Sequence, residues 1–301
     1  MMPPVQGTPG RPKPPRRTVA RRRALAALGL VAALGLVLAV AFFAVHRGGA
    51  AKPATTAAAP PPLRIIFPEG FTRQEMAARI TAVRKIAETR RGVTPTMTAR
   101  GYLAASARSK LPGVFAQDGR ARSLEGFLFP ATYDFIARTT SRQLVQKQLQ
   151  AFRANWAKVN LGYARSRHLT PYDVLIIASM IEKEALAPEE RALVAAVIYN
   201  RLHNRMPLGI DATIRYGLHI PPTQAIRGSQ LRSDNPYNTR LRRGLPPTPI
   251  ANPGLAAIQA AAHPARVGYL YYVRKPDKQH HFFTASYQAF LDYARAHGYG
   301  G

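Results

Sequence analysis

The chain has 301 residues, contains no cysteine and carries a formal net charge of +28 at pH 7. Its length allows one large domain or two smaller ones, and the lack of cysteine excludes disulfides and thiolate metal sites. Subtracting the seven basic residues that precede the first apolar run leaves +21 for the rest. This excess favours a polyanionic partner such as nucleic acid, an anionic membrane or an acidic polymer, but charge alone does not choose among them. An Arg-rich surface without such a partner is an equal alternative.

The first 62 residues predict a membrane anchor. Residues 24–45 form an uncharged run of about 22 residues, roughly 33 Å long as a helix, which matches a bilayer core. Three arginines at 21–23 flank it, so the positive-inside rule places the tail 1–23 in the cytoplasm and the body outside. A cleaved signal peptide is the alternative, but its apolar core is usually about 7 to 15 residues long. The Ala/Pro/Thr-rich stretch 46–62 is typical of a flexible linker.

Residues 63–120 predict a small α+β module. A short apolar strand at 63–67 precedes Thr72-Arg73-Gln74-Glu75, a capping box that begins an amphipathic helix, and a second helix is expected near 98–109. Beyond the module, apolar side chains at helical spacing predict a helix over 141–158. Its Trp156, the single tryptophan of the chain, is expected in the core.

The next helix places two carboxylates at the end of an apolar run. Thr170 is a good N-cap and Pro171 suits the first helical position. Residues 174–181 are apolar on every face except Ser179, so this helix is expected to be buried all round. Because Pro188 starts another helix, Glu182 and Glu184 fall near the last turn, where burial and the helix dipole both raise a carboxylate pKa. A group of that kind suits general acid catalysis near neutral pH.

The C-terminal third alternates loops with short elements. Segments 206–209, 219–223 and 233–252 are dense in Pro, Gly and Asn and predict loops. A short Ala-rich helix is expected from Asn252-Pro253 to about residue 262. Strands over 269–273 and 281–285 are expected to form a hairpin, and Ser286 is expected to cap a final helix that ends at Gly298.

No metal-ligand spacing or Gly-rich phosphate loop is visible. A resemblance is visible instead, carried by ordered blocks of sequence. These blocks are Leu124–Pro130, Ala178–Ala185, Glu190–Arg191 with Val194–Leu202, Asp211–Thr213, Pro236–Thr239, Gly244–Pro247, Ile250–Gly254 and His281–Phe283. In this respect the chain resembles the endolytic murein transglycosylase family, also called YceG-like. It departs from the family pattern at Arg240, Thr248 and Gln279.

The resemblance implies an α+β fold with a defined domain order. It implies a cytoplasmic tail (1–23), a transmembrane helix (24–45), a linker (46–62), a LysM-like module (63–120) and a mixed helical catalytic domain with a β-hairpin (121–301). It also implies a lytic transglycosylase of the inner membrane, facing the periplasm, that cuts nascent peptidoglycan between MurNAc and GlcNAc and leaves 1,6-anhydroMurNAc ends. The expected partners are glycan strands, the membrane and peptidoglycan synthases, without nucleic acid, cofactor or metal.

The first Glu of the Glu-Lys-Glu triplet is catalytic in that family, and it falls on Glu182. From the residues alone, Glu184 is a rival, although two positions on a helix differ by about 200° and only one can face a given cleft. Glu184 and Glu190 are expected to pair with Arg191 or to serve the helix ends. For one set of loop residues, sugar binding competes with loop shaping. This set is Asp211, Thr213, Tyr237 and Asn238.

Two other function classes stay open on the sequence. One is a catalytically silent peptidoglycan-binding or divisome scaffold. The other is a murein hydrolase that uses two carboxylates, in which Asp211 or Asp234 activates water.

Overall fold

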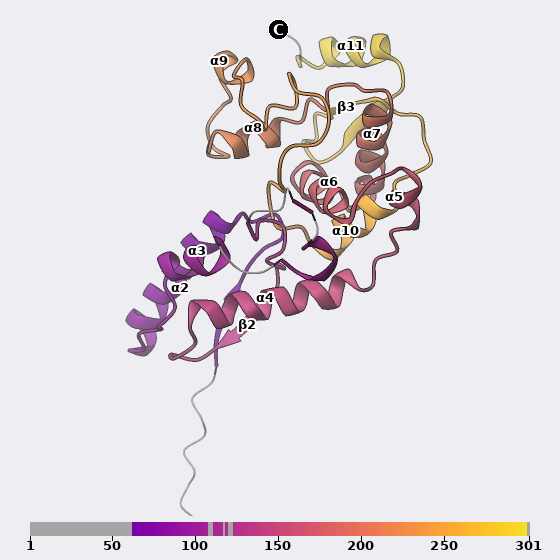
Figure 1. Ribbon diagram of the computed structural model, residues 1–301. Coiled ribbons are helices and arrows are strands. Elements are labelled where there is room, and N and C mark those ends of the chain that lie inside the picture. Colours follow the sequence, from indigo (N-terminus) through magenta and orange to yellow (C-terminus); the bar gives the residue numbers. More distant parts are fainter. Residues whose placement is uncertain (1–61, 108–110, 117, 120–122, 300–301) are drawn as a thin grey trace, which may run out of the picture. The chain divides into compact units, whose positions relative to one another are not determined.

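The computed structural model describes residues 62–299, except for 108–110, 117 and 120–122 (Figure 1). The elements follow the order β1 (Leu63–Ile66), α2 (Arg73–Arg91), α3 (Ala99–Ala107), η1 (Gly113–Phe115), β2 (Thr132–Phe135), α4 (Ser141–Trp156), α5 (Gly162–Ser166), α6 (Pro171–Glu184), η2 (Pro188–Glu190), α7 (Arg191–His203), α8 (Asp211–Gly217), α9 (Gly228–Leu231), α10 (Leu255–Ala262), β3 (Tyr271–Arg274), β4 (His281–Thr284) and α11 (Tyr287–Ala296). Helices with two small separate sheets confirm the α+β class.

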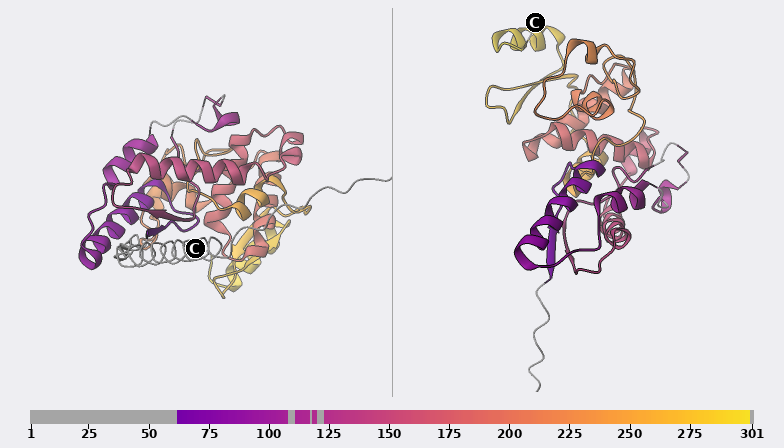
Figure 2. Two further views of the ribbon diagram at one scale, coloured as in Figure 1. Left: turned by 90° about the horizontal axis from the view of Figure 1, so that it is seen from below. Right: turned by 90° about the vertical axis from the view of Figure 1, so that its left-hand side faces the viewer.

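The N-terminal part combines one sheet with three helices. Strand β1 pairs antiparallel with β2, from Leu63 opposite Phe135 to Ile66 opposite Thr132. Helix α2 packs on α3, and α3 packs on α4, so that the three helices lie together (Figures 1 and 2). The predicted boundary at residue 120 therefore runs between two strands of one sheet. A LysM-like identity for this part stays a prediction.

The helix starts follow from local capping. Thr72 and Thr170 each accept a hydrogen bond from the backbone N–H three residues on, and the acid at that position bonds back to the cap. The expected helices α2 and α6 are thereby confirmed. Trp156 is partly buried and packs against the main apolar core.

The core of the C-terminal part is α6, which is packed against α7 and α10 (Figure 1). Every residue of α6 from Tyr172 to Ile181 is buried, as the all-round apolar pattern predicts. Strands β3 and β4 form the predicted hairpin, with Tyr271 opposite Thr284 and Arg274 opposite His281. Strand β2 and helix α8 were not expected from the sequence.

The predicted membrane span, 24–45, lies outside the described residues. Among the residues that the structure describes, no helix has the length and apolar character needed to cross a bilayer.

Candidate active site

Glu182 lies in the last turn of α6, half-buried at a meeting point of two helices. Its Oε2 accepts a hydrogen bond of 2.9 Å from the backbone N–H of Gly254, the residue that precedes α10. Burial raises the pKa of Glu182, and the nearby Glu69 raises it further. The Gly254 bond, Arg191 and Lys183 act in the opposite direction. The carboxyl is therefore held protonated to higher pH than a solvated Glu, yet it retains groups that stabilise its charged form.

Helix α6 holds the loop that carries Gly254 in place. The backbone N–H of Ile250 donates to Ser179 Oγ over 3.0 Å, and this hydroxyl donates to the carbonyl of Ile176 over 2.7 Å. Ser179 lies one turn before Glu182 on the same helix. The one polar residue between Val174 and Ile181 therefore holds the loop that contacts the carboxylate.

Asn252 fixes the same loop from the other side. It is fully buried, and its Oδ1 accepts a bond of 2.9 Å from the N–H of Leu128. Its Nδ2 donates to the Phe71 carbonyl over 2.9 Å and to Glu125 Oε1 over 2.7 Å. One amide thus links the loop to two segments far away in the sequence.

Glu125 is a buried carboxylate that the sequence analysis did not single out. It accepts bonds from Asn252, from the Arg73 N–H at 3.1 Å and from the Tyr216 hydroxyl at 3.1 Å. Burial raises its pKa to about 7, although these hydrogen bonds and the charge of Arg73 oppose the shift. The available signal was an acid in the apolar run Leu124–Phe129, which is unusual unless the acid is paired.

Glu184 faces a different surface from Glu182, as the helical geometry predicts. Its Oε2 accepts a bond of 3.1 Å from the Tyr272 hydroxyl on β3. Burial raises the pKa of Glu184. Glu190, expected to pair with Arg191 or to serve a helix end, accepts bonds from the His281 N–H at 2.8 Å and Nδ1 at 2.7 Å. These acids attach the hairpin to α6 and to η2.

The four residues expected to contact sugar are spread over the α8 region. Asp211 begins α8 and pairs with Arg240 at 2.7 Å, with about half of its side chain exposed. Tyr237 is half-buried, and its hydroxyl lies 2.8 Å from Thr248 Oγ1. Thr213 is fully buried and bonds to the carbonyl of Ile210 and to Thr239 Oγ1.

Asn238 is also fully buried, and its Nδ2 donates to the carbonyls of Leu231 and Ser233. In this conformation Thr213 and Asn238 shape the loop, whereas Asp211 and Tyr237 retain some exposed surface. A sugar contact for any of the four stays a prediction. Asn200 donates to the carbonyls of Val267 and Tyr269 and so braces the approach to the hairpin.

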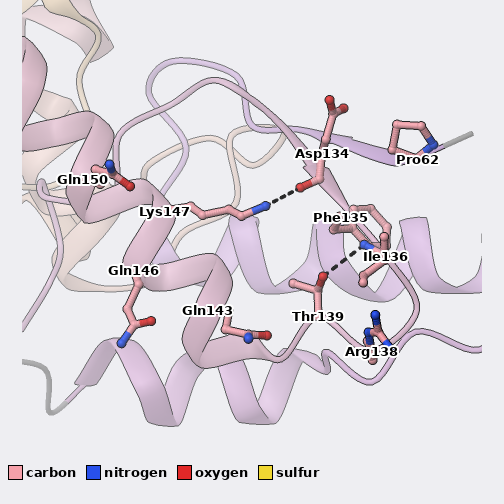
Figure 3. Close-up of a pocket in the computed structure, with 10 residues that line it drawn as sticks. All are labelled: Pro62, Asp134, Phe135, Ile136, Arg138, Thr139, Gln143, Gln146, Lys147 and Gln150. Atoms are coloured by element: carbon pink, nitrogen blue, oxygen red, sulfur yellow. Dashed lines mark hydrogen bonds between the residues drawn. The ribbon is translucent and has the colours of Figure 1, made fainter.

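A groove of about 660 Å³ lies on the N-terminal part, between α4 and the end of β2 (Figure 3). Two of its polar side chains bond within the groove, since Lys147 Nζ donates to the Asp134 carbonyl over 2.6 Å and Thr139 Oγ1 accepts from the Ile136 N–H over 3.0 Å. Neither Glu182 nor any other residue of α6 lines it. The groove is therefore separate from the candidate active site.

In the part of the chain that the structure describes, no three His, Asp or Glu side chains lie close enough together to hold a metal ion.

Known proteins resemble this chain along most of its length. A protein from Bacillus subtilis (strain 168) named endolytic murein transglycosylase is 37% identical over 154 residues, which are 50% of this chain and 42% of the relative. A protein of the same name from Streptococcus pneumoniae (strain ATCC BAA-255 / R6) is 32% identical over 229 residues, 69% of this chain and 40% of the relative. The matches therefore span about two fifths of the length of these curated relatives.

A solved structure and a family model also match this chain. A crystal structure of a YceG-like protein from Listeria monocytogenes superposes with a TM-score of 0.65 at 27% identity, covering 77% of this chain and 76% of that one. The model of the YceG-like family matches residues 44–296. The chain is therefore a member of the YceG-like family.

Proposed function

We propose that the chain is an endolytic lytic transglycosylase of peptidoglycan and that Glu182 is its catalytic acid and base. The observation that carries the proposal is the half-buried Glu182 carboxyl with a raised pKa, bonded to the Gly254 N–H. The activity named for the relatives, endolytic murein transglycosylase, supports the same assignment. The substrate is the glycan strand, cut between MurNAc and GlcNAc.

In the first step, the neutral Glu182 carboxyl protonates the glycosidic oxygen. The bond from C1 of MurNAc to this oxygen breaks, and GlcNAc leaves with a free 4-hydroxyl. Burial favours the neutral carboxyl before this step. After it, the carboxylate keeps the Gly254 hydrogen bond and the favourable charges of Arg191 and Lys183.

In the second step, the Glu182 carboxylate takes the proton of the MurNAc 6-hydroxyl. The 6-oxygen bonds to C1 and closes the 1,6-anhydro ring, and the carboxyl is neutral again. No water is consumed, so the reaction does not need the second carboxylate that a hydrolase normally requires. One carboxyl with a raised pKa is enough, because it donates a proton in the first step and accepts one in the second.

The two-carboxylate alternative receives less support from the geometry. Asp211 pairs with Arg240, and Asp234 is 88% exposed and pairs with Arg242 at 2.6 Å. The acid with the largest effect on Glu182 is Glu69 instead. A silent scaffold would have no use for a half-buried carboxyl, because burial raises its pKa and makes its ionised form costly to the fold.

The same proposal includes the finer predictions from the sequence. Residues 24–45 anchor the protein in the inner membrane with the body in the periplasm, and residues 63–120 are the LysM-like module ahead of the catalytic part. Synthases that supply the nascent strand are the expected protein partners. The positive body suits a glycan that carries lactyl and peptide carboxylates.

Digestion of purified peptidoglycan by the full chain in detergent tests the proposal. The wild type should release fragments with anhydroMurNAc ends, whereas Glu182→Gln should lower their rate of release by at least about 100-fold. Glu184→Gln is the matched control, because it makes the same change in the same helical turn on a surface that faces β3. Reducible MurNAc ends would indicate a hydrolase, and unchanged release by Glu182→Gln would contradict the proposal.

A further inference from the structure

The turn at residues 69–71 belongs to the N-terminal part but is hydrogen-bonded to the loop 250–254, which carries Asn252 and Gly254. The Gly70 N–H donates to the Asn252 carbonyl over 3.0 Å, and the Asn252 N–H donates to the Phe71 carbonyl over 2.9 Å. Lys183 Nζ adds a bond of 3.2 Å to the Gly70 carbonyl. These three bonds fix the turn beside the end of α6, next to Glu182.

Two glycines lie at this contact. Gly70 has φ +76°, a conformation that favours glycine, and a Cβ there would be in ordinary contact with Glu182 Cγ at 3.5 Å. A Cβ on Gly254 would overlap the carboxylate of Glu69. Glu69 therefore lies directly against the residue whose N–H bonds to Glu182, so that two carboxylates share one glycine as neighbour.

We propose that Glu69 is a positioning residue of the catalytic site, whose carboxylate, held against Gly254, places a second negative charge beside the Glu182 carboxyl. The inference rests on the proposed function and deepens it. Under this proposal, a residue of the N-terminal part of the chain contributes to the electrostatics of the site. A like charge close to a carboxyl disfavours its ionisation.

The other groups that face Glu182 act against Glu69. Arg191 at the start of α7 and Lys183 on α6 both favour the charged carboxylate, as does the N–H at the start of α10. The charge of Asp211, at the start of α8, raises the pKa of Glu184. Glu69 is exposed to solvent, so its effect is screened in part.

A carboxyl ¹³C titration measures the effect without relying on activity. The full chain in detergent is labelled at the glutamate carboxyl carbons, and the Glu182 signal is identified by its loss in Glu182→Gln. In Glu69→Gln the Glu182 midpoint should move to lower pH by about 0.5 to 1 unit. In Glu69→Asp, which keeps the charge, most of the wild-type midpoint should return.

Glu88→Gln is the matched control, since it removes a surface carboxylate of α2 that pairs with Arg84. Its Glu182 midpoint should equal the wild-type value. Addition of about 1 M salt should shrink the difference between wild type and Glu69→Gln, because screening weakens an exposed charge. A Glu182 midpoint that is the same in wild type and Glu69→Gln overturns the proposal.

The rate of anhydro-end release provides the second readout. The alkaline limb of the Glu69→Gln profile should move to lower pH by the same amount, with the rate at acid pH retained. A fall in rate of equal size at every pH would show a merely structural role and contradict the inference. If Glu182→Gln is as active as wild type, the proposed function fails, whereas the titration still decides whether Glu69 acts on Glu182.

Discussion

The effect of Glu125 on the pH dependence of stability tests how the N-terminal part is joined to the loop 250–254. Burial raises its pKa from an ordinary 4.5 to about 7. At about 1.4 kcal/mol per pKa unit, this difference corresponds to about 3 kcal/mol of folding free energy. The unfolded chain releases the proton near pH 4.5, while the folded chain holds it to about pH 7. The destabilisation is therefore absent below about pH 4.5, grows between these values and is complete above about pH 7.

Glu125→Gln isolates this term because the amide has nearly the same shape and does not ionise. The free energies of unfolding of wild type and variant are measured with urea at about pH 4 and pH 8. Between these conditions the difference should move in favour of the variant by about 3 kcal/mol. Other acids titrate equally in both proteins and cancel.

Glu88→Gln is the control for this comparison, because its carboxylate lies on the surface. Its difference from wild type should change by less than about 0.5 kcal/mol over the same range. If the Glu125→Gln difference is also constant with pH, Glu125 does not hold its proton in the folded chain. The buried network with Arg73, Asn252 and Tyr216 would then be incorrect.

Three further predictions concern the supports of the site. Tyr272→Phe removes the hydroxyl that bonds to the half-buried Glu184 and should lower the free energy of unfolding by about 1–3 kcal/mol in urea titrations, whereas Tyr271→Phe should change it by less than about 0.5 kcal/mol. Ser179→Ala leaves the Ile250 N–H without its acceptor and should cost about 1–3 kcal/mol by the same measurement. A chain that begins at residue 121 loses the strand paired with β2 and should show no cooperative thermal unfolding, so a sharp wild-type transition would contradict this packing.

The sequence predicts α6 and the position of Glu182 because the signals are local. A Thr cap, a proline at the first helical position and an unbroken apolar run define the helix within about four turns. Helical geometry also separates Glu182 from Glu184, and the structure gives them different partners. These features need no knowledge of how the rest of the chain packs.

The remaining parts of the site depend on contacts between distant segments. Strand β2 has only four residues, too few for a clear alternating pattern, and it forms because β1 is beside it. Glu69 carries no local sign of a role, since its position follows from the pairing of Gly70 and Phe71 with Asn252. Glu125 was visible as an acid among apolar residues, but its partners come from three other elements of the fold.

The loop 250–254 connects the stability of the fold to the proposed chemistry of Glu182. Glu125 and Ser179 hold this loop through Asn252 and Ile250, and the loop presents the Gly254 N–H to the Glu182 carboxylate. A group that first gives and then takes a proton needs both states within reach, so burial must be opposed by a bond to the charged form. A loosened loop would weaken that bond and leave only the charges of Arg191 and Lys183 to oppose burial. Changes at these buried supports should therefore alter the proton affinity of Glu182 as well as the stability of the chain.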